Sequence, residues 1–157
     1  MTDKQNAIIF GVGPGLGTAL FQKFESEGLC VFGVARTKKS LLNAMPQEKS
    51  QNRVITTTAD ATCTKDVDRI FKEATEMWGP PNIVIYNAGA YMKTSILNAT
   101  EEDFRRCWEA NCLGGFLVGK NAAKVMVPKG KGTILFTGAT ASKRGAAEFF
   151  NLSVGKA

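Results

Sequence analysis

Residues 7–17 of this chain read AIIFGVGPGLG, and this stretch decides the fold. A short apolar run meets three glycines (Gly11, Gly15 and Gly17), and the residues from Thr18 onward have the apolar spacing of a helix. A strand, a glycine turn and a helix in this order can bind a pyrophosphate. Glycines let the backbone approach the ligand, and the N–H groups at the helix start meet its negative charge. Taken alone, the stretch is equally compatible with a plain glycine turn.

Length and composition describe an ordinary globular chain. It has 157 residues, of which 44% are hydrophobic and 22% charged, enough for one domain with a real core. No apolar run reaches the ~18 residues of a membrane span, and the N-terminus lacks the apolar segment of a signal peptide. We therefore expect a cytoplasmic protein without a membrane partner.

Charge and residue types narrow the chemistry. The net charge is +6, but the basic residues are dispersed and lack interleaved aromatics, which argues against nucleic-acid binding. The chain has no histidine, so acid–base chemistry must come from Lys, Tyr, Ser or a carboxylate. The four cysteines show no CxxC spacing, which predicts no metal site and reduced, mostly buried thiols.

Strand-like and helix-like segments alternate along the whole chain. We expect strands at residues 7–10, 30–35, 53–59, 82–86 and 133–136. Helices are expected at residues 15–28, 40–45, 64–78 (capped by Thr62 or Thr64), 100–127 (capped by Thr100) and from 149 onward. The pattern predicts an α/β fold, a three-layer Rossmann-type doubly wound parallel sheet of about five strands, as one domain over residues 1–157.

Four marks in chain order resemble the short-chain dehydrogenase/reductase family. The glycine motif matches, with Phe10 where the family has Thr, and the others are Asp60, Asn87-Ala88-Gly89 and Asn111. The resemblance covers essentially the whole chain and implies an oxidoreductase with a nicotinamide dinucleotide cofactor. It implies cofactor contacts from Gly11, Gly15, Leu16, Gly17, Arg36, Asp60, Asn87, Ala88, Gly89 and Lys156.

Each mark also has a physical sense. The ends of parallel strands line the crevice that holds a dinucleotide, so Asp60 can accept a hydrogen bond from the adenine amino group, or else serve as a turn residue. The Asn87-Ala88-Gly89 segment is compact enough for a ribose to lie against it, or is an ordinary turn. Asn is mildly unfavourable inside a helix, so Asn111, followed by Gly114-Gly115, predicts a local irregularity. In the family this Asn helps to hold a water and the catalytic lysine.

Arg36 bears on the choice of cofactor. Folds specific for NAD usually place an acidic residue at the end of the second strand, to bond the ribose 2′-hydroxyl. Here Ala35 and Arg36 occupy that place, and a guanidinium suits a 2′-phosphate. We therefore expect NADP(H), with NAD(H) as the alternative; without a ligand Arg36 would be a solvated loop residue.

The resemblance is incomplete at the reacting end. The family uses Tyr-x-x-x-Lys on one helix, with a Ser thirteen residues before the Tyr. Lys156 matches the lysine, so the resemblance makes Lys156 and Asn111 catalytic, but Leu152 stands where the Tyr is expected and Ala139 where the Ser is expected. A missing general acid or base typically costs about 10²–10⁴-fold in rate.

Neighbouring groups are candidates to replace the missing hydroxyls. Around Ala139 lie Thr137, Thr140 and Ser142. A substitute for the tyrosine is harder to find, because Tyr86 ends a strand, as a cofactor-flanking or core residue, and Tyr91 lies in the following loop. Ser153 is next to Leu152, but helix geometry turns it about 100° away.

The chain stops one residue after Lys156, whereas the family continues with two more strands and most of the substrate pocket. We expect a fragment or a truncated product whose fifth strand is an uncovered edge. Two functions follow. One is an NADP(H)-dependent oxidoreductase acting on a carbonyl or alcohol, and the other is a non-catalytic dinucleotide-binding protein, either a pseudoenzyme or an interaction module. The oligomeric state stays open, with a homodimer as one option.

Overall fold

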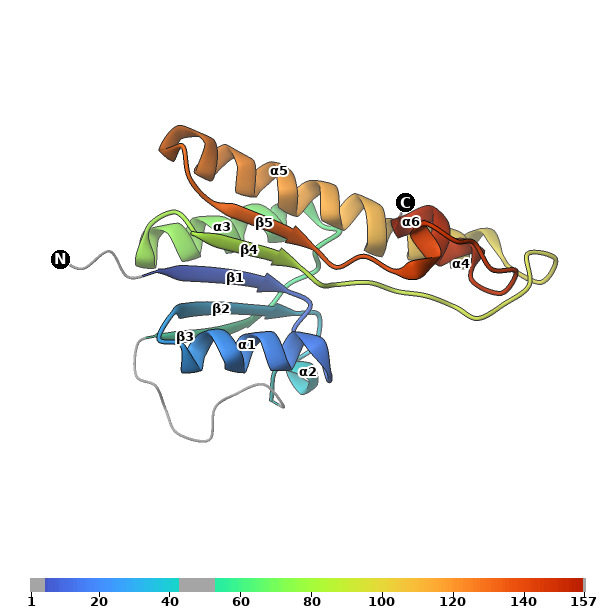
Figure 1. Ribbon diagram of the computed structural model, residues 1–157, viewed down its shortest axis with the longest axis horizontal. Helices are drawn as coiled ribbons and strands as arrows, with labels where there is room; N and C mark the ends of the chain where they lie inside the picture. The colour runs from blue at the N-terminus through green and yellow to red at the C-terminus, as the bar shows by residue number, and fades with distance from the viewer. Residues whose placement is uncertain (1–4, 43–52, 157) are drawn as a thin grey trace.

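Five parallel strands form one sheet in the order β3-β2-β1-β4-β5 (Figure 1). The computed structural model describes residues 5–42 and 53–156. The strands are β1 Asn6–Phe10, β2 Cys30–Ala35, β3 Val54–Thr58, β4 Ile83–Tyr86 and β5 Thr133–Phe136. The predicted strands are therefore all present, and each end agrees to within one residue.

The strand order reverses direction at β1. The chain proceeds from β1 outward to β3, and then returns to place β4 on the other side of β1. In an open parallel sheet, the crevice outside the carboxyl ends of the strands at such a switch point is where ligands bind. A ligand-binding site is therefore expected at the residues just after β1 and β4.

Helices cover both faces of the sheet (Figure 1). Helices α1 and α2 lie on one side, and α3 and α5 lie on the other. Their bounds are α1 Leu16–Ser26, α2 Lys38–Leu42, α3 Thr64–Trp78 and α5 Gly114–Met126, and the remaining helices are α4 Glu101–Trp108 and α6 Phe150–Lys156. The predicted three-layer Rossmann-type architecture is confirmed.

Side-chain alternation explains why the strands read as continuous apolar runs. In β1, Ile8 and Phe10 face the α3 and α5 layer, whereas Ile9 faces the α1 layer, and all three are fully buried. Because both faces of a central strand are covered, apolar residues are favoured along it. Asn6, at the start of β1, is buried as well, and its amide donates to the carbonyl oxygens of Trp78 and Gly79.

One irregularity lies within the long segment expected as a single helix. After α4, residues Glu109–Leu113 form a turn of π-helix, and α5 then continues. Such turns insert one residue into a helix and are frequent at functional sites. Asn111 lies inside this turn, so the predicted irregularity is confirmed. The expected cap is also confirmed, since the Thr100 hydroxyl accepts the backbone N–H of Asp103.

Three local predictions were wrong. Helix α2 begins at Lys38 rather than at residue 40, because the Thr37 hydroxyl accepts the backbone N–H of Ser40; residues 43–45 lie outside the described residues. Neither Thr62 nor Thr64 caps α3, whose N-cap is Cys63. Helix α1 ends at Ser26, two residues short of Gly28, whose φ of 86° stops the helix.

Strand β5 lies at one edge of the sheet, as expected. Its Leu135 and Phe136 side chains are 48% and 56% exposed, which is unusual for large apolar residues of a parallel sheet. Within the described residues, no helix combines the length and apolar character needed to cross a membrane.

Candidate functional site

The glycine turn packs tightly on one side and is open on the other. A Cβ on Gly11 would lie 2.3 Å from the backbone N of Ala88, and a Cβ on Gly17 would lie 2.2 Å from the backbone O of Gly11. These glycines therefore let β1, α1 and the end of β4 touch through their backbones. At Gly15, the N-cap of α1, φ is 99° and a Cβ would meet nothing within 4 Å.

This geometry fits the pyrophosphate of a dinucleotide. The first N–H groups of a helix have no partner inside the helix, and they carry the positive end of its dipole. At α1 they open onto a crevice of about 440 Å³ that includes Leu16 at the start of α1 and Arg36 after β2. A phosphate lying there meets backbone donors with no Cβ in the way.

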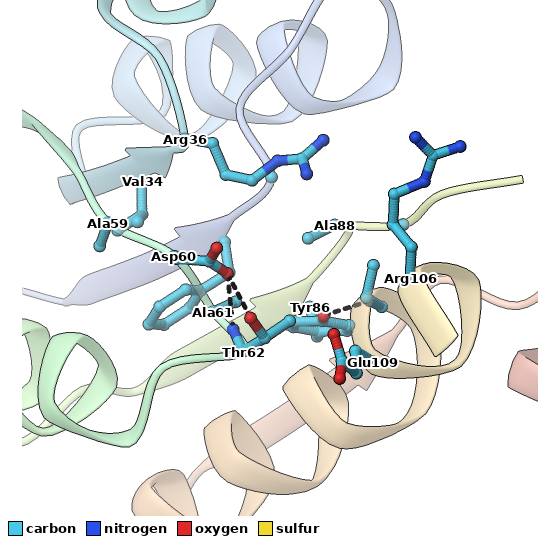
Figure 2. A pocket seen from close by; sticks show the side chains of 14 residues that line it. Val34, Arg36, Ala59, Asp60, Ala61, Thr62, Tyr86, Ala88, Arg106 and Glu109 are labelled. Atoms are coloured by element: carbon cyan, nitrogen blue, oxygen red, sulfur yellow. Dashed lines mark hydrogen bonds between the residues drawn. The ribbon is translucent and has the colours of Figure 1, made fainter. Parts of the chain in front are cut away.

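Arg36 follows directly after β2 and is exposed. It lines both the crevice above the glycine turn and a smaller pocket of about 120 Å³ beside Asp60 (Figure 2). The guanidinium therefore stands where two cavities meet, at the strand end that commonly selects between the two nicotinamide dinucleotides.

Asp60 forms a turn and also lines a pocket. One carboxylate oxygen accepts hydrogen bonds from both the backbone N–H and the hydroxyl of Thr62, at 2.9 and 2.8 Å. Asp60 is thus a turn residue, and it also lines the smaller pocket (Figure 2). The second carboxylate oxygen of Asp60 can still accept a hydrogen bond from a ligand in that pocket.

Tyr86 forms part of the floor of the same pocket. It is 1% exposed and its hydroxyl donates to the carbonyl oxygen of Ala110, while burial raises the pKa of the phenol far above its usual value. A Cβ on Gly114 would lie 2.2 Å from this hydroxyl, so the glycine pair after Asn111 makes room for the ring. Tyr86 is a protonated core residue.

The segment after β4 connects three strand ends. The Asn87 side chain donates to the carbonyl oxygen of Gly11 at 3.0 Å, and its amide oxygen accepts from the Thr137 hydroxyl at 2.9 Å. A Cβ on Gly89 would lie 2.8 Å from the Asn111 side-chain oxygen. Asn87 and Gly89 therefore hold the backbone of Ala88 in a fixed position along the crevice.

Asn111 uses its side chain to hold the neighbouring loop. Its amide nitrogen donates to the carbonyl oxygens of Ala90 and Cys107, and its oxygen accepts the backbone N–H of Ala90. The residue is 6% exposed. Both N–H donors of the amide are thus engaged, whereas its oxygen accepts one bond at 3.3 Å and can still accept another.

Lys156 reaches from α6 to the ends of β4 and β5. Its ammonium group donates to the carbonyl oxygen of Thr137 at 2.9 Å and lies 3.5 Å from that of Ala88. Burial lowers the pKa of the Lys156 amine. The structure thus brings Lys156 and Asn111 together beside the segment after β4, and both line a further cavity of about 390 Å³ with Thr137.

Leu152 and Ala139 stand at the chain positions where the family pattern has a tyrosine and a serine. Leu152 is four residues before Lys156 in α6, and therefore shares a helix face with it, whereas Ala139 is the N-cap of a short 3₁₀ turn, Thr140–Ser142.

Most neighbouring hydroxyls are engaged elsewhere. Ser142 donates to the carbonyl oxygen of Ala139, Ser153 donates to that of Phe149, and Thr137 is bound to Asn87. The Tyr91 ring is 64% exposed and packs against Phe149. None of these four hydroxyls belongs to the residues that line the crevice or the small pocket.

Sequence reasoning missed two residues and misjudged the cysteines. Arg106 and Glu109 line the small pocket from α4 and the π turn. Their mutual spacing of three residues puts them on one helix face, but nothing in the sequence connects that face with the pocket. Cys30 and Cys107 are buried, but Cys63 and Cys112 are exposed, contrary to expectation, because they lie at a helix start and on an open helix face. Among the described residues, no group of acidic or cysteine side chains could hold a metal ion.

The sheet order and the glycine turn at its switch point define a Rossmann-type protein. The profile of the family described as short chain dehydrogenase matches residues 5–157, and this chain belongs to that family.

Similar proteins carry related names. The chain is 32% identical over 134 residues to short chain aldehyde dehydrogenase 1 of Euphorbia lathyris, covering 83% of this chain and 46% of that protein. It is 29% identical over 144 residues to the NADPH-dependent pterin aldehyde reductase of Arabidopsis thaliana, covering 91% and 60%. A short-chain dehydrogenase structure from Rhodopseudomonas palustris superposes with a TM-score of 0.89 at 31% identity, covering 97% of this chain and 72% of that one. The chain thus spans about half the length of the curated relatives that it matches.

Proposed function

We propose that residues 1–157 form one dinucleotide-binding domain that binds NADP(H) and serves an oxidoreductase acting on a carbonyl or alcohol. The cofactor choice rests on Arg36, which follows β2 directly and lines both the crevice and the small pocket. No acidic residue stands at that strand end to repel a 2′-phosphate. The name of the Arabidopsis relative, an NADPH-dependent reductase, supports the same choice.

Each end of the crevice has a role in this proposal. The N–H groups at the start of α1 bind the pyrophosphate, with Gly15 and Leu16 at the contact, and Asp60 accepts from the adenine amino group. Ala88 and Gly89 provide a flat backbone for the ribose, and the Lys156 ammonium donates to its hydroxyls. When bound, the nicotinamide supplies hydride chemistry, and the protein supplies orientation and electrostatics.

A second function is favoured by one specific observation. Leu152 lies one turn before Lys156 on the same face of α6, and its side chain cannot donate a proton. We therefore retain non-catalytic dinucleotide binding, as a pseudoenzyme or an interaction module, as the alternative. Fluorescence titration with NADPH and NADH, followed by a screen for oxidation with carbonyl compounds, separates the two. Binding with turnover supports the enzyme, binding without turnover supports the alternative, and failure to bind either cofactor contradicts both.

Replacing Arg36 by alanine tests the cofactor choice. Removing a charge-assisted contact to the 2′-phosphate should weaken NADPH binding about 10- to 100-fold, and NADH binding only slightly. Lys39→Ala is the matched control, because Lys39 is an exposed cation of α2 that lines neither cavity. Fluorescence titration measures both affinities, and an equal loss for NADPH and NADH would refute the assignment.

A further inference from the structure

The small pocket beside Asp60 has a second basic side chain, on the wall opposite β2 (Figure 2). Its floor is apolar, built from the strand-end residues Phe10, Val34, Ala59 and Tyr86. Its volume is about 120 Å³, and an apolar cavity of about 150 Å³ holds a benzene molecule. The pocket is smaller than that cavity, so an aromatic heterocycle can enter it only in part, with an edge or face left open to solvent.

Arg106 reaches this pocket from α4. It lies four residues before Ala110, another lining residue, so the two share one helix face. In Figure 2 the guanidinium groups of Arg36 and Arg106 both extend beyond the strand ends, from different elements. The carboxylates of Asp60 and Glu109 line the same pocket, so its formal charges balance. What Arg106 adds to the pocket is therefore a planar group that can lie against the π face of a ligand.

The bonding of Arg106 leaves its guanidinium available. Its ion pair with Asp103 spans 3.8 Å, and the Arg106 side chain is 58% exposed. Asp103 already accepts the Thr100 hydroxyl at 2.7 Å, as part of the α4 cap. Such an exposed, long ion pair contributes little to stability, so a ligand can displace it at low cost.

We propose that Arg106 binds the adenine of the cofactor, with its planar guanidinium lying over the open face of the base. This inference rests on the proposed function, since it takes an adenine dinucleotide as the ligand. Guanidinium planes stack on aromatic rings, and base stacking of this kind does not depend on the ribose substituent. The two arginines then divide the recognition: Arg36 selects the 2′-phosphate, and Arg106 contributes affinity common to NADPH and NADH.

The test compares two neighbouring arginines of α4. Arg106→Ala should weaken NADPH, NADH and ADP-ribose about tenfold each, because the three share the adenine. Arg105→Ala is the matched control, since Arg105 is exposed, binds Glu101 at 2.7 Å and does not line the pocket. It should change each affinity less than about twofold. Affinities are measured by nicotinamide fluorescence for the dinucleotides and by calorimetry for ADP-ribose.

The outcomes separate this inference from the proposed function. If the unmodified chain binds no dinucleotide, both fail. If it binds NADPH and Arg106→Ala behaves like Arg105→Ala, only the inference fails. A loss confined to NADPH would also overturn it, because Arg106 would then contact the 2′-phosphate and not the base. Arg106→Lys, which keeps the charge without the plane, should lose most of the affinity that Arg106→Ala loses.

Discussion

Replacing Gly11 by alanine should lower the free energy of unfolding by about 2–4 kcal/mol. Two costs add at this position. The φ of Gly11 is 96°, a conformation that strains any residue with a Cβ, and that Cβ would lie 2.3 Å from the backbone N of Ala88. The neighbour is backbone of the segment after β4, so it cannot turn aside as a flexible side chain would. Urea denaturation followed by circular dichroism measures the change.

Gly13→Ala provides the control within the same turn. A Cβ on Gly13 meets nothing within 4 Å, and Gly13 is not among the glycines with positive φ. Its free energy of unfolding should change by less than about 0.5 kcal/mol. Equal destabilisation by the two substitutions would mean that the contact between the turn and β4 does not restrict residue 11.

Replacing Leu152 by tyrosine should produce the largest gain in activity. If the proton donor is what the proposed oxidoreductase lacks, a phenol one helical turn before Lys156 should raise kcat/KM for a carbonyl substrate by about 10²–10⁴-fold. The nearby ammonium group favours the ionised phenol, and so lowers its pKa toward neutrality. NADPH oxidation measured at 340 nm is the assay.

Leu152→Phe separates chemistry from packing, since it adds the ring without the hydroxyl and should leave turnover at the level of the unmodified chain. Adding Ala139→Ser to Leu152→Tyr should raise the rate further, because the serine hydroxyl would position the substrate oxygen. If Leu152→Tyr is as inactive as Leu152→Phe while NADPH still binds, the missing hydroxyl is not what limits catalysis, and the non-catalytic alternative gains support.

Local patterns were sufficient to predict most of the fold. The apolar runs in β1 and β2 gave the buried parallel strands, since apolar residues are favoured on both faces of a central strand. The helix ends were less accurate. Cys63 occupies the N-cap position of α3 without a side-chain hydrogen bond, while the Thr62 hydroxyl is bound to Asp60 and Thr64 lies within the helix. Helix and capping propensities of single residues do not include such competition between local hydrogen bonds, so they did not predict the N-cap of α3.

The candidate site was predictable only where a motif marks it. Gly11, Asp60, Asn87 and Asn111 stood out by residue type at strand ends or inside a helix. Arg106 did not, because an arginine on an amphipathic helix is ordinarily a solvated residue. Its relevance arises from the packing of α4 beside the end of β4, which brings it to the same pocket as Arg36.

The sequence by itself determined the alternation of strands and helices, the glycine turn after β1 and the residues at positions 139 and 152 where hydroxyls are expected. These features depend on residue type and spacing along the chain, which the sequence contains directly. Only the tertiary structure decided that both N–H donors of the Asn111 amide are engaged by Ala90 and Cys107, that Lys156 bonds the ends of β4 and β5, and that two arginines share one pocket. Apart from the Asn111–Cys107 bond, which lies within one helical segment, these contacts join segments distant in sequence, and the crossovers of the sheet determine which segments meet.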